Sequence, residues 1–221
     1  MIDLHTHTFF SDGVLIPSEL VYRAKFLNYA AIAITDHIDY SNMDFVIPKI
    51  VEVSKVLTDN YEIFVLPGAE LTYIPPKLIG AATEKCRKLG AKIIVVHGET
   101  KAETVPPQTN LSAVKADIDI LAHPGFLSEE EAEIAAKNDI KIEITTRNFH
   151  KKTNDAVARV ALQKSAKLVL NTDAHQPDNL LTKQIIKETL AAAGLEENYY
   201  EIMLKNSREI ISKYQKGAKE R

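Results

Sequence analysis

Short runs of apolar residues, rich in Ile and Val, recur at fairly even intervals along the chain. Nearly every position in each run is apolar, which is the pattern of parallel strands that are buried on both faces. A sheet with one face in water would instead alternate apolar and polar positions. We therefore predict seven parallel strands, at residues 1–4, 31–35, 62–66, 92–96, 118–122, 140–145 and 168–171.

The longer segments between these runs carry apolar residues at helical spacing. Pro17 and Gly90 stand where the start of one helix and the end of another are expected. Strands and helices thus alternate, which is typical of an α/β fold. The predicted helices lie at residues 17–27, 45–59, 77–90, 129–138 and 154–166.

Alternating units of this kind either close into a barrel or lie open as a doubly wound sheet, and periodicity alone does not distinguish the two. No predicted strand is followed by a glycine-rich nucleotide-binding motif, so the nucleotide-binding open sheets lose support. The sequence has no repeat and no linker rich in Gly, Ser or Pro, which favours one domain over residues 1–221. We expect its core at residues 1–178 and two terminal helices at residues 179–216.

Composition and charge narrow the possible partners. The 221 residues are 45% apolar and 26% charged, as in ordinary soluble proteins, and the formal net charge of −3 makes nucleic acid an unfavourable partner. Cys86 is the only cysteine, so an intramolecular disulfide and a thiolate metal cluster are excluded. The amino terminus has no signal-peptide pattern and no apolar run is long enough to span a membrane. We expect a cytoplasmic protein with no membrane partner.

The histidines carry the main chemical signal. Six of the seven stand at or just after the ends of predicted strands, and carboxylates lie close to them in the same segments. In a parallel barrel these strand ends converge on one face, which is where active sites of such folds are built. The histidines are His5, His7, His37, His97, His123 and His175, and the carboxylates are Asp12, Asp36, Glu70 and Asp173.

This cluster predicts metal binding. His5 and His7 are separated by one residue on a strand, so their rings lie on the same face. Imidazole is the commonest side-chain metal ligand, and the cluster offers more donors than one zinc ion uses, so we expect two or more ions. Nitrogen and oxygen donors without thiolate suit Zn, Mn or Fe and do not discriminate among them.

Other catalytic classes fit the residues less well. The sequence has no G-x-S-x-G motif for a serine hydrolase, and Cys86 lies within a predicted helix. Paired carboxylates of a glycosidase remain possible in principle, but they would leave the six histidines unexplained.

A series of short motifs runs in order from residue 3 to residue 175. The motifs are HTHT at residues 5–8, SDG at 11–13, TDH at 35–37, GAE at 68–70, HG at 97–98, HP at 123–124 and DAH at 173–175. Taken as a set, they resemble the PHP (polymerase and histidinol phosphatase) superfamily, and residues 97–99 and 143–150 resemble its small histidinol phosphatase-like members. The resemblance implies a distorted, TIM-like barrel of seven β/α units and a trinuclear metal site that hydrolyses phosphoesters.

The resemblance also implies how the ligands are shared among two or three divalent transition metal ions, Zn, Mn or Fe. Glu70 would bridge two ions, and Glu70, Asp173 and His175 are the expected catalytic residues. The implied ligand sets are His5, His7, Glu70 and Asp173 for one ion, Glu70, His97 and His123 for a second, and Asp12, His37 and His175 for a third.

The function that we expect is hydrolysis of a small phosphomonoester by metal-activated water, with histidinol phosphate as a specific candidate substrate. One alternative is a phosphodiesterase or exonuclease that acts on nucleotides or nucleic acid. A second alternative is a non-catalytic RNA-processing subunit with a PHP-like barrel, which the slightly acidic composition and the full ligand set disfavour. The sequence does not determine the oligomeric state.

Arg147 is the expected substrate-binding residue. It directly follows the sixth predicted strand, so it should stand on the same rim as the ligands, where a guanidinium binds two phosphate oxygens through its fixed fork. The alternative is that Arg147 pairs with a carboxylate such as Glu143 or lies in solvent. His150 is interpreted as a plain loop residue.

Overall fold

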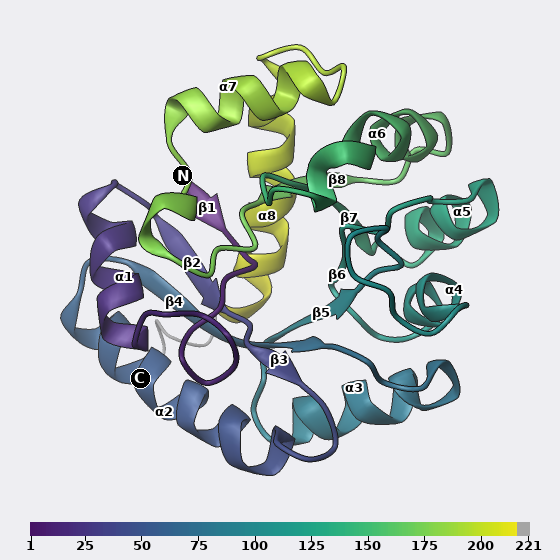
Figure 1. Cartoon of the computed structure of the whole chain (residues 1–221). Coiled ribbons are helices and arrows are strands. Elements are labelled where there is room, and N and C mark those ends of the chain that lie inside the picture. Colours follow the sequence, from purple (N-terminus) through teal and green to yellow (C-terminus); the bar gives the residue numbers. More distant parts are fainter. Residues whose placement is uncertain (216–221) are drawn as a thin grey trace.

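In the computed structural model, which describes residues 1–215, parallel strands form a barrel surrounded by helices (Figure 1). All paired strands are parallel, and neighbours follow the order β1-β2-β4-β5-β6-β7-β8. The fold is therefore the TIM-like α/β barrel that was expected. The strands are β1 (Ile2–Asp3), β2 (Ala31–Ile34), β3 (His37–Ile38), β4 (Phe64–Leu71), β5 (Ile93–His97), β6 (Ile120–Ala122), β7 (Lys141–Thr145) and β8 (Leu168–Asn171).

The barrel closes where the first and last strands run past their regular pairing. A parallel bridge joins Thr6 to Ala174, the backbone N–H of His7 donates to the Ala174 carbonyl at 2.8 Å, and that of Asp173 donates to the His5 carbonyl at 2.9 Å. Candidate ligands from the two ends of the sequence are thereby held side by side by backbone hydrogen bonds.

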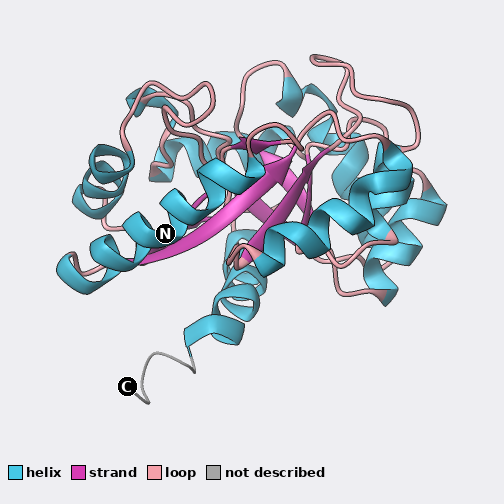
Figure 2. Ribbon diagram, turned by 90° about the horizontal axis from the view of Figure 1, so that it is seen from below, coloured by secondary structure: helices cyan, strands magenta, loops and turns pink. Residues whose placement is uncertain are grey.

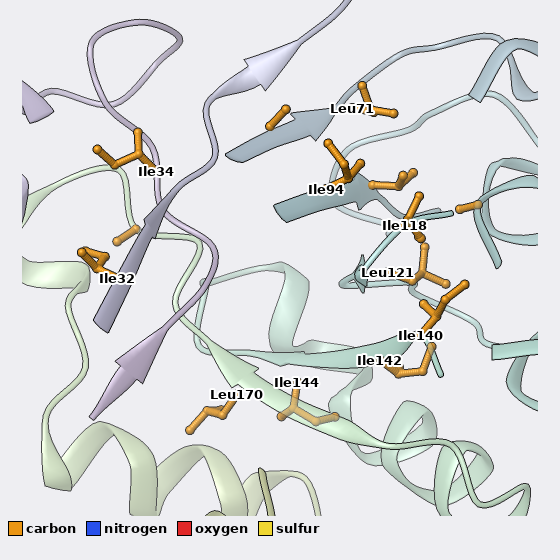
Figure 3. Packing of buried hydrophobic residues seen from close by; sticks show 14 of the residues in the cluster. Ile32, Ile34, Leu71, Ile94, Ile118, Leu121, Ile140, Ile142, Ile144 and Leu170 are labelled. Carbon is orange, nitrogen blue, oxygen red and sulfur yellow. The ribbon is translucent and has the colours of Figure 1, made fainter. Parts of the chain in front are cut away.

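The helices cover the outside of the strands (Figures 1 and 2). Isoleucine, leucine and valine side chains fill the layer between, as Figure 3 shows for Ile32, Ile94, Leu121 and Ile142. The α-helices are α1 (Pro17–Phe26), α2 (Met43–Asn60), α3 (Ile79–Lys88), α4 (Thr109–Val114), α5 (Glu129–Lys137), α6 (Asn154–Gln163), α7 (Lys183–Ala192) and α8 (Tyr199–Gln215).

A second, smaller core joins the strands to α8. Side chains that alternate with the outward-facing ones, such as Ile93 and Val95 on β5, cluster with Ile210 and Ile211 of α8. The Asn206 side chain donates to the carbonyl of Leu168, the first residue of β8, at 2.8 Å. Helix α8 therefore packs across the amino ends of the strands, and it projects from that end of the barrel in Figure 2.

Three details differ from the sequence prediction. The third predicted strand, at residues 62–66, continues to Leu71. Pro67 does not end the strand, because the pairing with β5 begins only at the next residue, Gly68. The short strand β3, which pairs with the second half of β4, and the short helix α4 were not predicted. The predicted end of the terminal helices at residue 216 lies outside the described residues.

No helix within residues 1–215 combines the length and the apolar character that a membrane span requires.

Candidate metal centre

The nine predicted metal ligands meet at the carboxyl end of the barrel. The sequence suggested that Glu70 follows a strand that ends at residue 66. In the structure, Glu70 lies inside β4. Most of the nine side chains are buried, whereas Asp12 is 54% exposed. His5, His7 and Asp12 follow β1, His37 begins β3, His97 ends β5, His123 follows β6, and Asp173 and His175 follow β8.

The potential ligand atoms fall into groups whose members all lie within 4.8 Å of one another. Three of these groups match the sets that the family resemblance implies, although Glu70 is absent from the first and His7 joins the third. The three groups are His5, His7 and Asp173; Glu70, His97 and His123; and His7, Asp12, His37 and His175.

Around His5 and His7, potential ligand atoms face one another at short range. His7 Nε2 lies 3.2 Å from His5 Nε2 and 3.1 Å from Asp173 Oδ1, and His5 Nε2 lies 3.2 Å from Glu70 Oε1. Two ligands on one tetrahedral ion, with bonds of about 2.0–2.1 Å, are separated by roughly 3.3–3.4 Å. The observed spacings therefore fit donors that share an ion.

Glu70 links the first group to the second. Its Oε1 atom lies 3.2 Å from His5 Nε2 and 3.5 Å from His123 Nε2, while Oε2 lies 2.6 Å from His37 Nδ1. Glu70 Oε1 is buried and has no hydrogen-bond partner within residues 1–215. A buried acceptor in this state costs free energy unless a cation compensates it, so the carboxylate fits a bridging position between two ions.

The third group lies at the mouth of the centre. Asp12 Oδ1 is 3.0 Å from His175 Nε2 and 3.6 Å from His37 Nε2. Because Asp12 is exposed, an ion held there would be the most accessible of the three to solvent.

Hydrogen bonds from the surrounding protein set the orientation of several rings. Glu143 Oε2 lies 2.8 Å from His5 Nδ1 and accepts a hydrogen bond from Asn171 at 3.0 Å. His97 Nδ1 donates to the Gly98 carbonyl at 3.1 Å. Because a carboxylate or a carbonyl accepts the Nδ1 proton, Nε2 keeps its lone pair for a metal ion.

The backbone at two candidate ligands is strained. His123 has a φ of 25° and Asp173 a φ of 53°, which are conformations that residues other than glycine seldom adopt. Strain of this kind concentrates at functional sites, where surrounding structure maintains it. His123 directly follows β6 and Asp173 lies two residues after β8, so the strained conformation accompanies the turn out of the barrel.

Burial and neighbouring charges shift the pKa values of residues in the cluster. Burial alone would raise the pKa of Glu70, but His5 and His37 lower that pKa well below its usual range. Burial lowers the pKa of His7 to about 3, which keeps its ring neutral. An ionised carboxylate and a neutral imidazole are the forms that bind a metal ion.

Arg147 stands beside this cluster, on the loop that follows β7. Its Nη1 donates to the Asp173 carbonyl at 3.2 Å, and its Nε lies 3.8 Å from Asp173 Oδ2. Glu143, the suggested alternative partner, is buried in the barrel and contacts His5 instead. Arg147 also lines cavities of about 350 and 460 Å³ next to the centre, and its role toward substrate stays a prediction.

Three residues near the centre were not recognised as site residues from the sequence. Glu143 lies inside a predicted strand, where period-two alternation with the outward-facing Ile142 and Ile144 could have placed it in the barrel. The interpretation of His150 as a plain loop residue is wrong, because its ring is buried and packs 4.4 Å from the ring of His123. Glu103 Oε2 lies 3.6 Å from His97 Nε2, and no sequence motif marks it.

The sequence profile of the PHP domain family matches residues 3–219, almost the whole chain. The chain belongs to the PHP domain family. An uncharacterized protein of Methanocaldococcus jannaschii is 48% identical to this PHP domain over 195 residues, which cover 87% of this chain and 89% of that protein.

Solved structures share the fold of this PHP domain at low sequence identity. A chain in the cryo-EM structure of archaeal ribonuclease P with mature tRNA is 17% identical and has a TM-score of 0.71, with 95% of this chain and 89% of that chain covered. A candidate histidinol phosphatase, hisK, from Listeria monocytogenes is 12% identical and has a TM-score of 0.57, with 81% of this chain and 97% of that chain covered. These similarities show a shared architecture.

Proposed function

We propose that this protein is a metal-dependent phosphoesterase that hydrolyses a small phosphomonoester. The observation that carries the proposal is the position of Glu70, whose unpartnered buried Oε1 atom faces the Nε2 atoms of His5 and His123. Glu70 belongs to the donor group with His97 and His123 and also lies 3.2 Å from His5 of the adjoining group, as a carboxylate between two neighbouring ions would. In this proposal two or three divalent ions, Zn, Mn or Fe, are held by the nine residues described above.

When bound, such ions lower the pKa of a coordinated water and offset the charge that develops on a phosphoryl group during transfer. The protein itself orients the ligands. Glu143 contacts Nδ1 of His5 and so turns Nε2 of that ring toward Glu70, and Glu70, with Asp173 and His175, sets the geometry at the centre of the site. We assign Glu70, Asp173 and His175 as the catalytic residues on this basis.

Arg147 places a positive charge beside the metal centre, where an anionic substrate would bind, in a chain whose net charge is −3. Its guanidinium lies beside Asp173, and its forked donors match two oxygens of a phosphate group. The site residues therefore divide into metal ligands, which lie on or after six strands, and Arg147, the expected phosphate-binding residue, on the loop after β7.

The space beside the centre supports a small substrate. Three adjoining cavities of about 350 to 460 Å³ are lined by residues of the centre and its rim, among them Asp12, His37, Arg147 and His150. Such volumes are at the lower end of those that hold small organic ligands. The family membership and the fold shared with hisK support histidinol phosphate as one candidate substrate.

A second candidate function is binding or processing of RNA. The fold shared with a chain of archaeal ribonuclease P favours testing it, whereas the net charge of −3 and the intact set of donors favour small-molecule catalysis. A phosphodiesterase would use the same metal centre and would differ only in the ester that it accepts.

One experiment separates these functions. The protein is stripped with a chelator, reloaded in turn with Mn, Zn and Fe, and assayed on a panel of phosphomonoesters that includes histidinol phosphate, on a phosphodiester and on a labelled oligoribonucleotide. We expect metal-dependent release of inorganic phosphate, with kcat/KM for the best monoester at least about tenfold above that for the diester and the oligonucleotide. Cleavage confined to the diester or the oligonucleotide, or tRNA binding without any hydrolysis, would overturn the proposal.

A further inference from the structure

One cavity beside the metal centre is lined mainly by positive charges. It has a volume of about 460 Å³ and lies between residues 100–103, after β5, and residues 147–153, after β7. Its charged lining residues are the cations Lys101, Arg147 and Lys152 and the single carboxylate of Glu103. The lining therefore has a net positive charge, although the whole chain has a net charge of −3.

The two neighbouring cavities differ from this one in charge. The cavity that contains His37 is lined by the carboxylates of Asp12, Asp39 and Glu103, and none of the described residues in its lining is a lysine or arginine. The cavity that contains His175 is lined by one carboxylate, Asp12, and one cation, Arg147. Positive charge is thus concentrated on one side of the metal centre.

The two lysines of this cavity are not neutralised by carboxylates. Within the described residues, neither Lys101 nor Lys152 forms an ion pair, and each ammonium group lies over an aromatic ring instead. Nζ of Lys101 is 4.2 Å from the centre of the Phe126 ring, and Nζ of Lys152 is 5.4 Å from that of Phe149. An aromatic face attracts a cation but leaves its charge in place, so both ammonium groups are available to an anion.

The cavity adjoins the metal centre at His150. The ring of His150 lines the cavity and lies 4.4 Å from the ring of His123, one of the predicted ligands. Its Nδ1 atom lies 3.0 Å from the Thr100 hydroxyl, and this contact joins the two segments that form the cavity. Arg147, which also lines the cavity, contacts Asp173 of the centre. An ester whose phosphate lies at the centre can therefore extend its alcohol part into this cavity.

We propose that this cavity binds the alcohol part of the substrate, and that this part carries a second anionic group, either a carboxylate or a second phosphate. Lys101 and Lys152 bind the second anion, while Arg147 stays beside the phosphate that is cleaved. This inference rests on the proposed function and narrows its substrate class. Because the lysines repel a cation, it ranks esters with an anionic alcohol part above esters with an ammonium group, such as histidinol phosphate.

The test compares four small phosphate esters that differ in the charge of the alcohol part. 3-Phosphoglycerate carries a carboxylate, propane-1,3-diol bisphosphate a second phosphate, glycerol 3-phosphate no further charge and phosphoethanolamine an ammonium group. With the metal-reloaded wild type, we expect kcat/KM for the better anionic ester to exceed that for glycerol 3-phosphate by at least about tenfold and to fall toward it at high salt. Phosphoethanolamine should be the poorest substrate, and the better anionic ester identifies the second group.

Variants of the two lysines test which residues create this preference. Lys101→Gln and Lys152→Gln should each lower the ratio of kcat/KM between the better anionic ester and glycerol 3-phosphate by about 2- to 5-fold, and the double variant by about tenfold. The matched control is Lys205→Gln, which removes the charge of an exposed lysine on α8. It should keep the ratio of the wild type.

The outcomes distinguish this inference from the proposed function. If no ester is hydrolysed with any of the metals, the proposed function is overturned and the inference falls with it. If the esters are hydrolysed but kcat/KM for the anionic and neutral ones agrees within twofold, the inference alone is overturned. The same conclusion follows if the double variant keeps the wild-type ratio. Each result compares two substrates on the same variant, so a general loss of folded protein or of metal does not imitate a loss of preference.

Discussion

Glu70 contributes one carboxylate to contacts with His5, His37 and His123 at once. A carboxylate has two oxygens and can bind two ions, whereas an amide has a single oxygen acceptor. We expect Glu70→Gln to lose two ions per chain together, as measured by elemental analysis after reloading and gel filtration. Loss of a single ion, or full metal content with full activity, would show that Glu70 does not bridge.

Arg147 lies beside Asp173 and is partly exposed to the adjoining cavities. If it binds substrate phosphate, Arg147→Ala should lower kcat/KM on the best monoester by about 10- to 100-fold, or about 1.4–2.7 kcal/mol, with unchanged metal content. Arg147→Lys should recover part of the loss, since it restores the charge without the fork. A value for Arg147→Ala within twofold of wild type would leave phosphate binding to the ions alone.

The site residues that only tertiary contacts bring to the metal centre were the hardest to predict from the sequence. The strand-end histidines were predictable because a parallel barrel brings all carboxyl ends of its strands together. Glu143 and Glu103 were not, because their neighbours His5 and His97 are 138 and 6 positions away and no local pattern specifies either contact.

At the scale of elements, the apolar runs predicted the strands because buried parallel strands carry little else. The same reasoning missed the end of β4, since Pro67 and Gly68 normally interrupt a strand. A Cβ atom on Gly68 would lie 2.5 Å from a methyl carbon of Ile93 and 2.7 Å from one of Thr35, so glycine permits the close approach of neighbouring strands here. Strand β3, with only two residues, is too short to leave a periodic pattern.

Helix α8 is tied to the amino end of the barrel by a charged cluster. Lys167 contacts Glu209 at 2.7 Å and Asp139 at 2.9 Å, while the buried Lys141 lies 2.7 Å from Asp139. The hydrogen bond from Lys167 lowers the pKa of Glu209, and Lys141 and Lys167 lower that of Asp139 although burial would raise it. Carboxylates with lowered pKa values stabilise the folded state above their unfolded pKa values and lose this contribution as the pH falls through the folded ones.

We therefore expect Glu209→Gln to reduce the free energy of unfolding by about 0.5–1 kcal/mol at pH 7, a small value because Glu209 is 35% exposed and solvent screens the pair. The difference from wild type should shrink below about pH 4, where the wild-type carboxylate also becomes protonated. Urea unfolding of the chelator-stripped proteins at pH 7 and pH 3 measures both values, with Glu130→Gln, which changes an exposed glutamate on α5, as the control. A difference that is equal at the two pH values would contradict the electrostatic explanation.

On the scale of the whole molecule, the two ends of the barrel carry different kinds of side chain. Helix α8 and its apolar side chains cover the amino end, whereas the carboxyl end gathers the buried carboxylates and imidazoles. Like charges buried together destabilise the folded state unless cations compensate them. The metal centre should therefore contribute to stability as well as to catalysis.

Removal of metal by a chelator should accordingly lower the thermal midpoint of unfolding. A ligand present at 100 times its dissociation constant stabilises the folded state by about 2.7 kcal/mol, which for a chain of this size is a shift of roughly 5–10 °C. Differential scanning calorimetry of the stripped and the Mn- or Zn-reloaded protein measures the shift. Equal midpoints would mean that the folded and unfolded states bind the ions equally or that neither binds them.

We expect nine side chains, spread between residues 5 and 175, to form one multinuclear metal centre. Elemental analysis by mass spectrometry of the purified protein, after metal repletion and removal of free ions, tests it most directly. We expect two to three transition-metal ions per chain. Less than one ion per chain under saturating conditions would contradict it.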